Sequence, residues 1–193
     1  CTDGGAFKST IIDQGAVSAL TVVALVRSTE DTLTRKVCSK ALYNLLDATN
    51  AVERMVEEGL VGALTALSGI DDETLEFFAE GVCNVAQYKC GRTEVGKERV
   101  LRTLLSLVKS KNPKMHRACA QTLCNLSTFD DGKYCRTVAK AGGMKAIQKL
   151  VVHFHEQNDH EMEERCTRTL CALACNAESR EIFLIDGGLH TLM

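Results

Sequence analysis

The sequence of 193 residues has no tryptophan, one proline, three tyrosines and six phenylalanines. β-Sandwiches and barrels use aromatic and turn-forming residues freely, so this composition argues against them. No uninterrupted apolar run reaches the roughly 18 residues that a membrane-spanning helix needs, and no secretory signal is visible. The formal net charge of −2 gives no basic surface for phosphates. We therefore expect neither a nucleic-acid partner nor a membrane span.

The sequence does contain a repeat, which is clearest in the segment MHRACAQTLCNLS at residues 115–127. One position of the repeat, which we call the slot, is occupied by Asn44, Asn84, Asn125 and Ala172, at successive intervals of 40, 41 and 47 residues. A recurrence at that period predicts a helical solenoid in which each repeat packs on its neighbours.

Each repeat opens on a glycine, namely Gly15, Gly59, Gly96 and Gly143. Apolar or small residues follow four and eight positions later, which is the buried stripe of a helix. The predicted unit of about 42 residues is a short helix, a glycine break, a medium helix, a polar turn and a long helix. We expect a single array with repeats at about 5–48, 49–88, 89–129 and 130–175 and a truncated fifth at 176–193, apparently an excerpt of a longer protein.

The helix boundaries follow from capping signals. Asn50 with Glu53 has capping-box spacing, Asp71 or Asp72 starts one long helix, and Asn112-Pro113 starts the next. Residues 88–96 contain two glycines and few apolar residues, so we expect a loop or a single turn there. The predicted helices span residues 6–13, 17–27, 32–47, 51–58, 60–69, 72–86, 97–109, 113–127, 133–140, 144–155, 161–175 and 176–185.

Ten cysteines recur in columns and do not suggest a disulfide framework. One column is Cys38, Cys119 and Cys166; the other is Cys83, Cys124 and Cys171. Cysteines in register are most simply small apolar residues at equivalent core sites. This interpretation favours a reducing compartment, either cytoplasm or nucleus.

The motifs Gly-Ala-Val-x-Ala-Leu at residues 15–20 and Gly-Leu-Val-Gly-Ala-Leu at residues 59–64, with Leu-x-Asn-Leu near the end of the long helix, resemble the armadillo repeat. The resemblance covers essentially the whole chain. It implies an all-α, right-handed superhelical solenoid of three-helix repeats, whose third helices line a concave groove. HEAT-like repeats are the alternative, but they have two helices and lack the glycine break.

The resemblance also implies which residues bind a partner. In armadillo proteins of the importin-α and β-catenin type, the slot asparagine binds the backbone of an extended peptide. By resemblance, we expect Asn44, Asn84 and Asn125 to have this role. The alternative is that these amides only bond backbone carbonyls of neighbouring loops. The remaining groove candidates are Lys40, Glu80, Gln121 and Arg168 four residues before the slot, and Lys36 and Arg117 eight before it.

The groove candidates differ from the importin-α pattern, because the positions four residues before the slot contain no tryptophan. Charges of alternating sign, with Glu76 and Glu164 in the same column as Lys36, favour a mixed-charge partner.

Chemical motifs are absent from the sequence. No phosphate-binding loop, nucleophile elbow or paired-carboxylate motif appears, and His116 with Cys119 lacks further ligands for a metal. We expect no enzyme activity, metal or cofactor, and predict a scaffold that binds an extended or helical segment of another protein. The alternatives are a regulatory or targeting segment of a larger enzyme, and a structural component that self-associates through uncapped terminal repeats.

Overall fold

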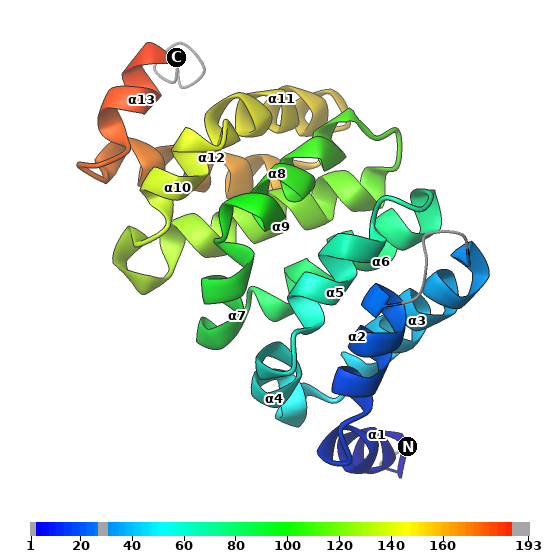
Figure 1. Cartoon of the computed structure of the whole chain (residues 1–193). Coiled ribbons are helices and arrows are strands. Elements are labelled where there is room, and N and C mark those ends of the chain that lie inside the picture. The colour runs from blue at the N-terminus through cyan, green and yellow to red at the C-terminus, as the bar shows by residue number, and fades with distance from the viewer. Residues whose placement is uncertain (1–2, 27–30, 187–193) are drawn as a thin grey trace. The chain divides into compact units, whose positions relative to one another are not determined.

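The computed structural model describes residues 3–26 and 31–186, and within these ranges the regular structure is helical, without a strand (Figure 1). The chain forms two compact units, residues 1–95 and 96–193. We call them the first and the second unit. The predicted opening of a fifth repeat at residues 187–193 lies outside the described ranges.

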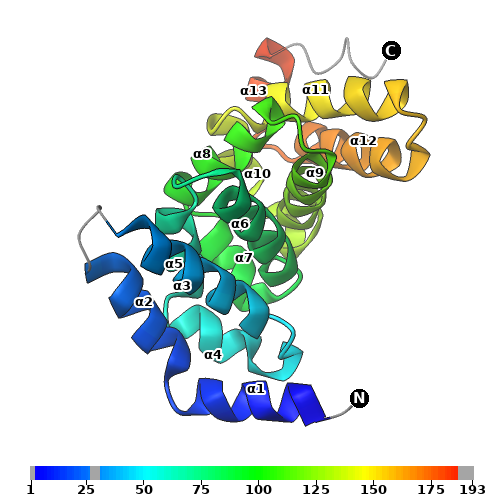
Figure 2. The same ribbon diagram turned by 90° about the vertical axis from the view of Figure 1, so that its right-hand side faces the viewer.

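The first unit holds two rounds of three helices, the third being the longest of each round, followed by one further short helix. Its helices are α1 (Asp3–Asp13), α2 (Ala16–Val26), α3 (Thr32–Leu45), the 3-10 turn Thr49–Ala51, α4 (Val52–Glu57), α5 (Leu60–Leu67), α6 (Asp72–Val85) and α7 (Lys89–Val95). The pair α2 and α3 packs on the pair α5 and α6, so the core lies between successive repeats (Figure 2).

The second unit has the same order of helices. They are α8 (Glu98–Ser106) with the 3-10 turn Leu107–Lys109, α9 (Pro113–Thr128), the 3-10 turn Asp130–Gly132, α10 (Cys135–Lys140), α11 (Gly143–Glu156), α12 (His160–Cys175) and α13 (Arg180–Ile185). The long helices α9 and α12 lie side by side, and α11 packs along α12 (Figure 1). None of the described helices is long and apolar enough to cross a membrane.

Left-handed glycines separate α1 from α2, α4 from α5 and α10 from α11, whereas Gly96 before α8 is not left-handed. Gly15, Gly59 and Gly142 have φ of +82°, +92° and +92°, a conformation that disfavours any side chain. The sequence aligned Gly143 with this column, but the break is one residue earlier. A Cβ on Gly143 would lie 2.5 Å from Cγ1 of Val138, so this second glycine permits close packing instead.

Two of the three helix starts predicted from capping signals match the structure. Asn112 caps α9, accepting from the backbone N–H of Lys114, with the proline next to it. Asp71 caps α6 in a capping box with Thr74. The predicted box at Asn50 is wrong, because a 3-10 turn occupies Thr49–Ala51 and the Asn50 side chain instead accepts from the hydroxyl of Ser9.

Within residues 88–96, where composition predicted a loop or a single turn, Lys89–Val95 form the helix α7. In α7, Gly91 lies so close to α6 that a Cβ would be 2.0 Å from the carbonyl oxygen of Val85. Arg92 is buried, and its guanidinium donates to the carbonyls of Ala86 and Gln87. The glycine here permits close packing, and the arginine binds the C-terminal carbonyls of the preceding helix.

The two cysteine columns differ in burial. Cys38, Cys119 and Cys166 are all buried, as predicted for core positions. In the second column only Cys124 is buried; Cys83 is half-buried and Cys171 is exposed. The core interpretation is therefore wrong for Cys171, because that column lies at the edge of the buried stripe. Burial raises the pKa of the Cys166 thiol to about 12.

Candidate functional site

The slot asparagines have unequal surroundings. Asn44 and Asn84 are exposed on α3 and α6, and neither side chain has a hydrogen-bond partner within the described part of the chain. Asn125 on α9 is 4 % exposed, and its amide nitrogen is buried without a partner in the described structure. Ala172 occupies the slot on α12. Two of the three predicted amides thus face solvent and one does not.

In the first unit, an aromatic pair lies beside the exposed amides. The rings of Tyr43 on α3 and Phe77 on α6 stack with centroids 5.2 Å apart. The Tyr43 hydroxyl donates to the carboxylate of Glu80, a predicted groove residue. This hydrogen bond to a carboxylate, with partial burial, raises the pKa of Tyr43 to about 12. Glu80 therefore joins two successive repeats.

Lys36, another predicted groove residue, forms an ion pair with Asp71, the N-cap of α6. The pair raises the pKa of Lys36 and, with the Thr74 N–H, holds the pKa of Asp71 below its ordinary value. Lys40, one turn further along α3, is exposed. The polar face of the first unit thus contains one cation in an ion pair and one exposed cation near the two amides.

A pocket of about 300 Å³ adjoins Asn84 in the first unit. It lies where the C-terminal ends of α3 and α6 meet the start of α4. Its lining residues are Leu46, Asp47, Thr49, Val52, Asn84, Gln87 and Tyr88. The exposed amide of Asn84 therefore borders a hollow that a side chain of a bound peptide can enter.

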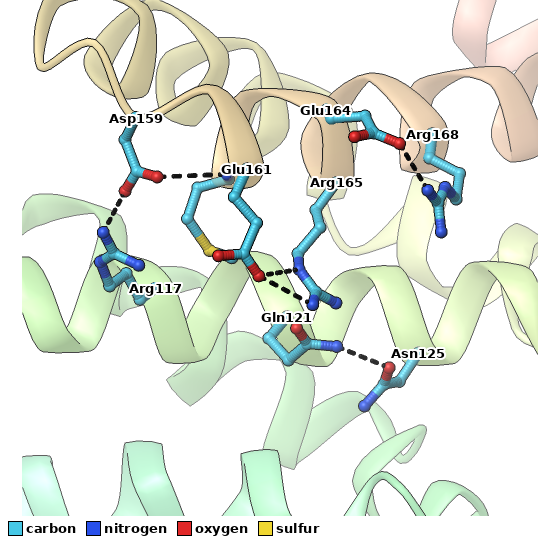
Figure 3. Close-up of polar contacts among 9 residues, drawn as sticks. Arg117, Gln121, Asn125, Asp159, Glu161, Glu164, Arg165 and Arg168 are labelled. Atoms are coloured by element: carbon cyan, nitrogen blue, oxygen red, sulfur yellow. Dashed lines mark hydrogen bonds and ion pairs between the residues drawn. The ribbon is translucent and has the colours of Figure 1, made fainter.

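In the second unit, ion pairs and a side-chain hydrogen bond lie on the polar face of α9 and α12 (Figure 3). Arg117 on α9 pairs with Asp159, the N-cap of α12. Arg165 bonds Glu161 at 3.0 Å. The guanidinium of Arg168 bonds Glu164 at 2.6 Å. The cations that the sequence assigned to a partner are thus already paired within the chain.

The side chains of Gln121 and Asn125 hydrogen-bond to each other, and neither has a hydrogen bond to another side chain in the described ranges. The Gln121 amide donates to Oδ1 of Asn125 at 2.9 Å, which orients the asparagine (Figure 3). The open amide nitrogen of Asn125 has less than 1 Å² of exposed surface. This nitrogen reaches a partner only if neighbouring side chains move.

The contacts between successive repeats were not predicted from the sequence. Lys36 to Asp71 spans 35 residues, Tyr43 to Glu80 spans 37 and Arg117 to Asp159 spans 42. A detectable signal was present: opposite charges, or a hydroxyl and a carboxylate, recur about one repeat apart. From the sequence, we expected each column of charges to face a partner. In the structure, several of these side chains contact the next repeat instead.

Histidines gather near the start of α12 without forming a metal site. His116 on α9 is buried, and its ring packs edge-on against His153 of α11 with centroids 4.5 Å apart. His155 lies 3.1 Å from a carboxylate oxygen of Glu163. Throughout the described ranges, no group of three or more His, Cys, Asp or Glu side chains is arranged to hold a metal ion.

Comparison with known proteins identifies the repeat type. Residues 91–128, which cover most of α7 and all of α8 and α9, match the family model described as Armadillo/beta-catenin-like repeat. No curated protein is significantly similar in sequence.

Three solved structures, each titled the crystal structure of an engineered protein, share the fold at 21% identity. Their TM-scores are 0.75, 0.73 and 0.76, and they match 97% of this chain over 74%, 76% and 45% of their own lengths. The likeness in fold and the helix order show an all-helical repeat fold. Within it, residues 91–128 match one armadillo-like repeat.

Proposed function

We propose that this chain is a non-enzymatic interaction scaffold whose first unit binds an extended segment of another protein across α3 and α6. Armadillo-like repeats commonly act in protein–protein interaction. The observation that carries the proposal is that Asn44 and Asn84 are exposed and without a partner in the described structure. An amide has both a donor and an acceptor, so each side chain can bond one peptide group of an extended chain.

The surroundings of the two amides support the same surface. Lys40 is exposed on α3, Glu80 is half-buried on α6, and the stacked Tyr43 and Phe77 lie between the two helices. This combination suits a segment that carries both charge signs and at least one apolar side chain. The pocket next to Asn84 provides a site for one of its side chains.

The second unit is the less favourable surface for the same partner. There Arg117 and Arg168 have carboxylate partners, and Asn125 is buried. A partner that uses these groups must first break contacts within the chain, which reduces the net gain from binding. We therefore assign the main contacts to Asn44 and Asn84 and only weak, peripheral ones to Lys36, Gln121 and Arg168.

Free thiols support a reducing location. Five of the nine described cysteines are buried in the core, and the nine form no disulfide with one another. Cytoplasm and nucleus both meet that condition.

A peptide library displayed on phage tests the proposal. Peptides selected on the whole chain should lose roughly two- to tenfold in affinity when Asn84 or Asn44 is replaced by alanine, the size of one hydrogen bond. Lys140→Ala, an exposed change on α10, is the matched control and should leave affinity unchanged.

Stability separates binding from an internal role. Because asparagine is a poorer helix former than alanine, Asn84→Ala at an exposed helical position should leave the melting temperature equal or slightly raised. A loss of more than about 2 kcal/mol in unfolding free energy would show that the amide has an internal partner instead. Selected peptides that ignore both asparagines would contradict the assigned surface.

A further inference from the structure

Two exposed thiols stand apart from the other cysteines. Of the nine described cysteines, five are buried and two half-buried, whereas Cys171 and Cys175 on α12 are exposed. They lie four residues apart, so they share one face of the helix. Both line the same pocket of the second unit, between the C-terminal turns of α9 and α12.

This pocket is larger than its counterpart in the first unit. It encloses about 630 Å³, whereas the pocket at the ends of α3 and α6 encloses about 300 Å³. In the first unit, the amide side chains of Asn84 and Gln87 line the pocket; in the second, the same slots hold Ala172 and Cys175. The smaller side chains of Ala172 and Cys175 leave more room at these two positions.

A second observation points to a polar ligand. Ser127 on α9 lines the pocket, is 2 % exposed, and its hydroxyl has no hydrogen-bond partner in the described structure. Buried polar groups are nearly always hydrogen-bonded, so this hydroxyl favours a partner from elsewhere. Its oxygen has less than 1 Å² of exposed surface, so a ligand in the pocket reaches it only when neighbouring side chains move. The neighbouring Thr128 hydroxyl already donates to the carbonyl of Cys124 at 2.7 Å.

The pocket also carries both charge signs. Arg168 lies one turn before Cys171 on α12, and the exposed Asp131 lies on the turn after α9. Arg168 pairs with Glu164, but both side chains are more than half exposed, at 58% and 70%. Such an exposed pair contributes little, so a ligand carboxylate can replace Glu164. Asp131 is the matching acceptor for a ligand ammonium group.

We propose that this pocket binds a small zwitterionic disulfide of the glutathione type and that Cys171 forms a mixed disulfide with it. A ligand carboxylate on Arg168 places the ligand sulfur next to Cys171. A small movement of the side chains over Ser127 then lets a peptide group of the ligand bond its hydroxyl. The Cys171 thiolate attacks one ligand sulfur, the ligand S–S bond breaks, and a new S–S bond forms. The other half of the ligand leaves as a thiolate and takes up the proton that Cys171 lost.

Helix geometry keeps Cys175 from completing the exchange. The Cβ atoms of residues i and i+4 in a helix are about 5–6 Å apart. A disulfide needs about 3.5–4.5 Å between these atoms. Cys175 therefore cannot displace the ligand and close an internal disulfide while α12 is intact, and the mixed disulfide persists until an external thiol reduces it.

The test is mass spectrometry of the whole chain after incubation with glutathione disulfide at a pH of about 8, near the ordinary thiol pKa. The expected product is one glutathionyl group per chain, mapped to Cys171. Cys171→Ser should abolish it, whereas Cys175→Ser should leave it in place. Arg168→Gln should slow the reaction about two- to fivefold, the weight of one exposed charge pair.

A neutral disulfide, hydroxyethyl disulfide, separates binding from mere exposure. It should react with Cys171 at a rate that Arg168→Gln and Ser127→Ala leave unchanged, because it has no carboxylate or peptide group. Equal effects of these variants on both reagents would overturn the proposal. Modification that maps to Cys175, or to several cysteines at similar rates, would overturn it as well.

Discussion

Asn44, Asn84 and Asn125 occupy one slot of the repeat, yet two are exposed and the third is 4 % exposed. The same residue type therefore has different consequences, which depend on what the neighbouring repeat places beside it. An exposed amide can change partners freely, whereas a buried one contributes to stability through a bond such as that between Gln121 and Asn125.

Leu123 provides the clearest prediction for the core. It is fully buried on α9, so Leu123→Ala should lower the unfolding free energy by about 2–5 kcal/mol, measured by urea denaturation. Leu33 on α3 is 72 % exposed, and Leu33→Ala should change stability by less than about 0.5 kcal/mol. Similar values for the two variants would mean that the faces of these helices are assigned incorrectly.

His116 should make stability dependent on pH. Burial, together with the charge of the adjacent His153, lowers the pKa of His116 below its ordinary value of 6.5. As pH falls below 6.5, the unfolded chain takes up this proton before the folded chain does. The contribution of His116 to stability is therefore complete above pH 6.5 and is lost as pH falls through its lower folded pKa.

Urea denaturation at a series of pH values between about 7.5 and 5.5, spanning the ordinary histidine pKa, measures this dependence. His116→Phe should flatten the curve, because phenylalanine does not titrate. His160→Gln, a change of an exposed histidine, should keep the slope. Glu163, whose pKa is lowered by His155, acts only below its ordinary value of 4.5 and lies outside this window. An unchanged slope in His116→Phe would exclude His116 as the cause.

At the scale of the helices, glycine has two different roles. Gly15, Gly59 and Gly142 allow left-handed turns between short and medium helices. Gly91 lies inside α7 and lets that helix touch the end of α6. Composition alone predicted a break at Gly91, because both roles use the same residue type.

Gly91→Ala should therefore destabilise the protein. The new Cβ would meet the Val85 carbonyl oxygen at 2.0 Å, so α7 must shift, at a cost of about 1–3 kcal/mol for overpacking. Gly62→Ala in α5 is the matched control, since its Cβ would meet nothing within 4 Å. That change should stabilise by about 0.5–1 kcal/mol through helix propensity. Calorimetry of both variants decides whether α7 is packed as described.

At the scale of the whole molecule, the first repeat leaves apolar positions uncovered that the second repeat buries. Ala19 is exposed and Val23 is 38 % exposed on α2, whereas Ala63 and Leu67 in the same slots of α5 are fully buried. The α5 positions are covered because α2 and α3 pack on α5. The other exposed apolar residues of this face are Val22, Leu25, Leu33 and Val37.

Self-association through this face follows as a prediction. Sedimentation velocity over a range of concentrations should show a rising average mass. The double change Leu25→Glu and Leu33→Glu should keep the chain monomeric. Val152→Glu, at an exposed apolar position on α11, should leave the association intact. A chain that is monomeric at every concentration would rule out this role for the face.

The sequence alone determined the features that depend on near neighbours along the chain. Periodic apolar residues placed the helices, Asn112 and Asp71 marked their starts, and the column of Cys38, Cys119 and Cys166 marked core positions. The family match at residues 91–128 confirms the repeat type. These predictions hold because helix period and capping act within a few residues.

Only the tertiary structure decided which polar slots are free. Lys36 and Arg117 looked like groove residues until Asp71 and Asp159, one repeat later, were found beside them. The burial of Asn125 and the widened pocket at Cys171 likewise depend on side chains more than 30 residues away or on another helix. A slot in the sequence fixes a side chain's direction on its own helix, but packing between repeats determines what that side chain meets.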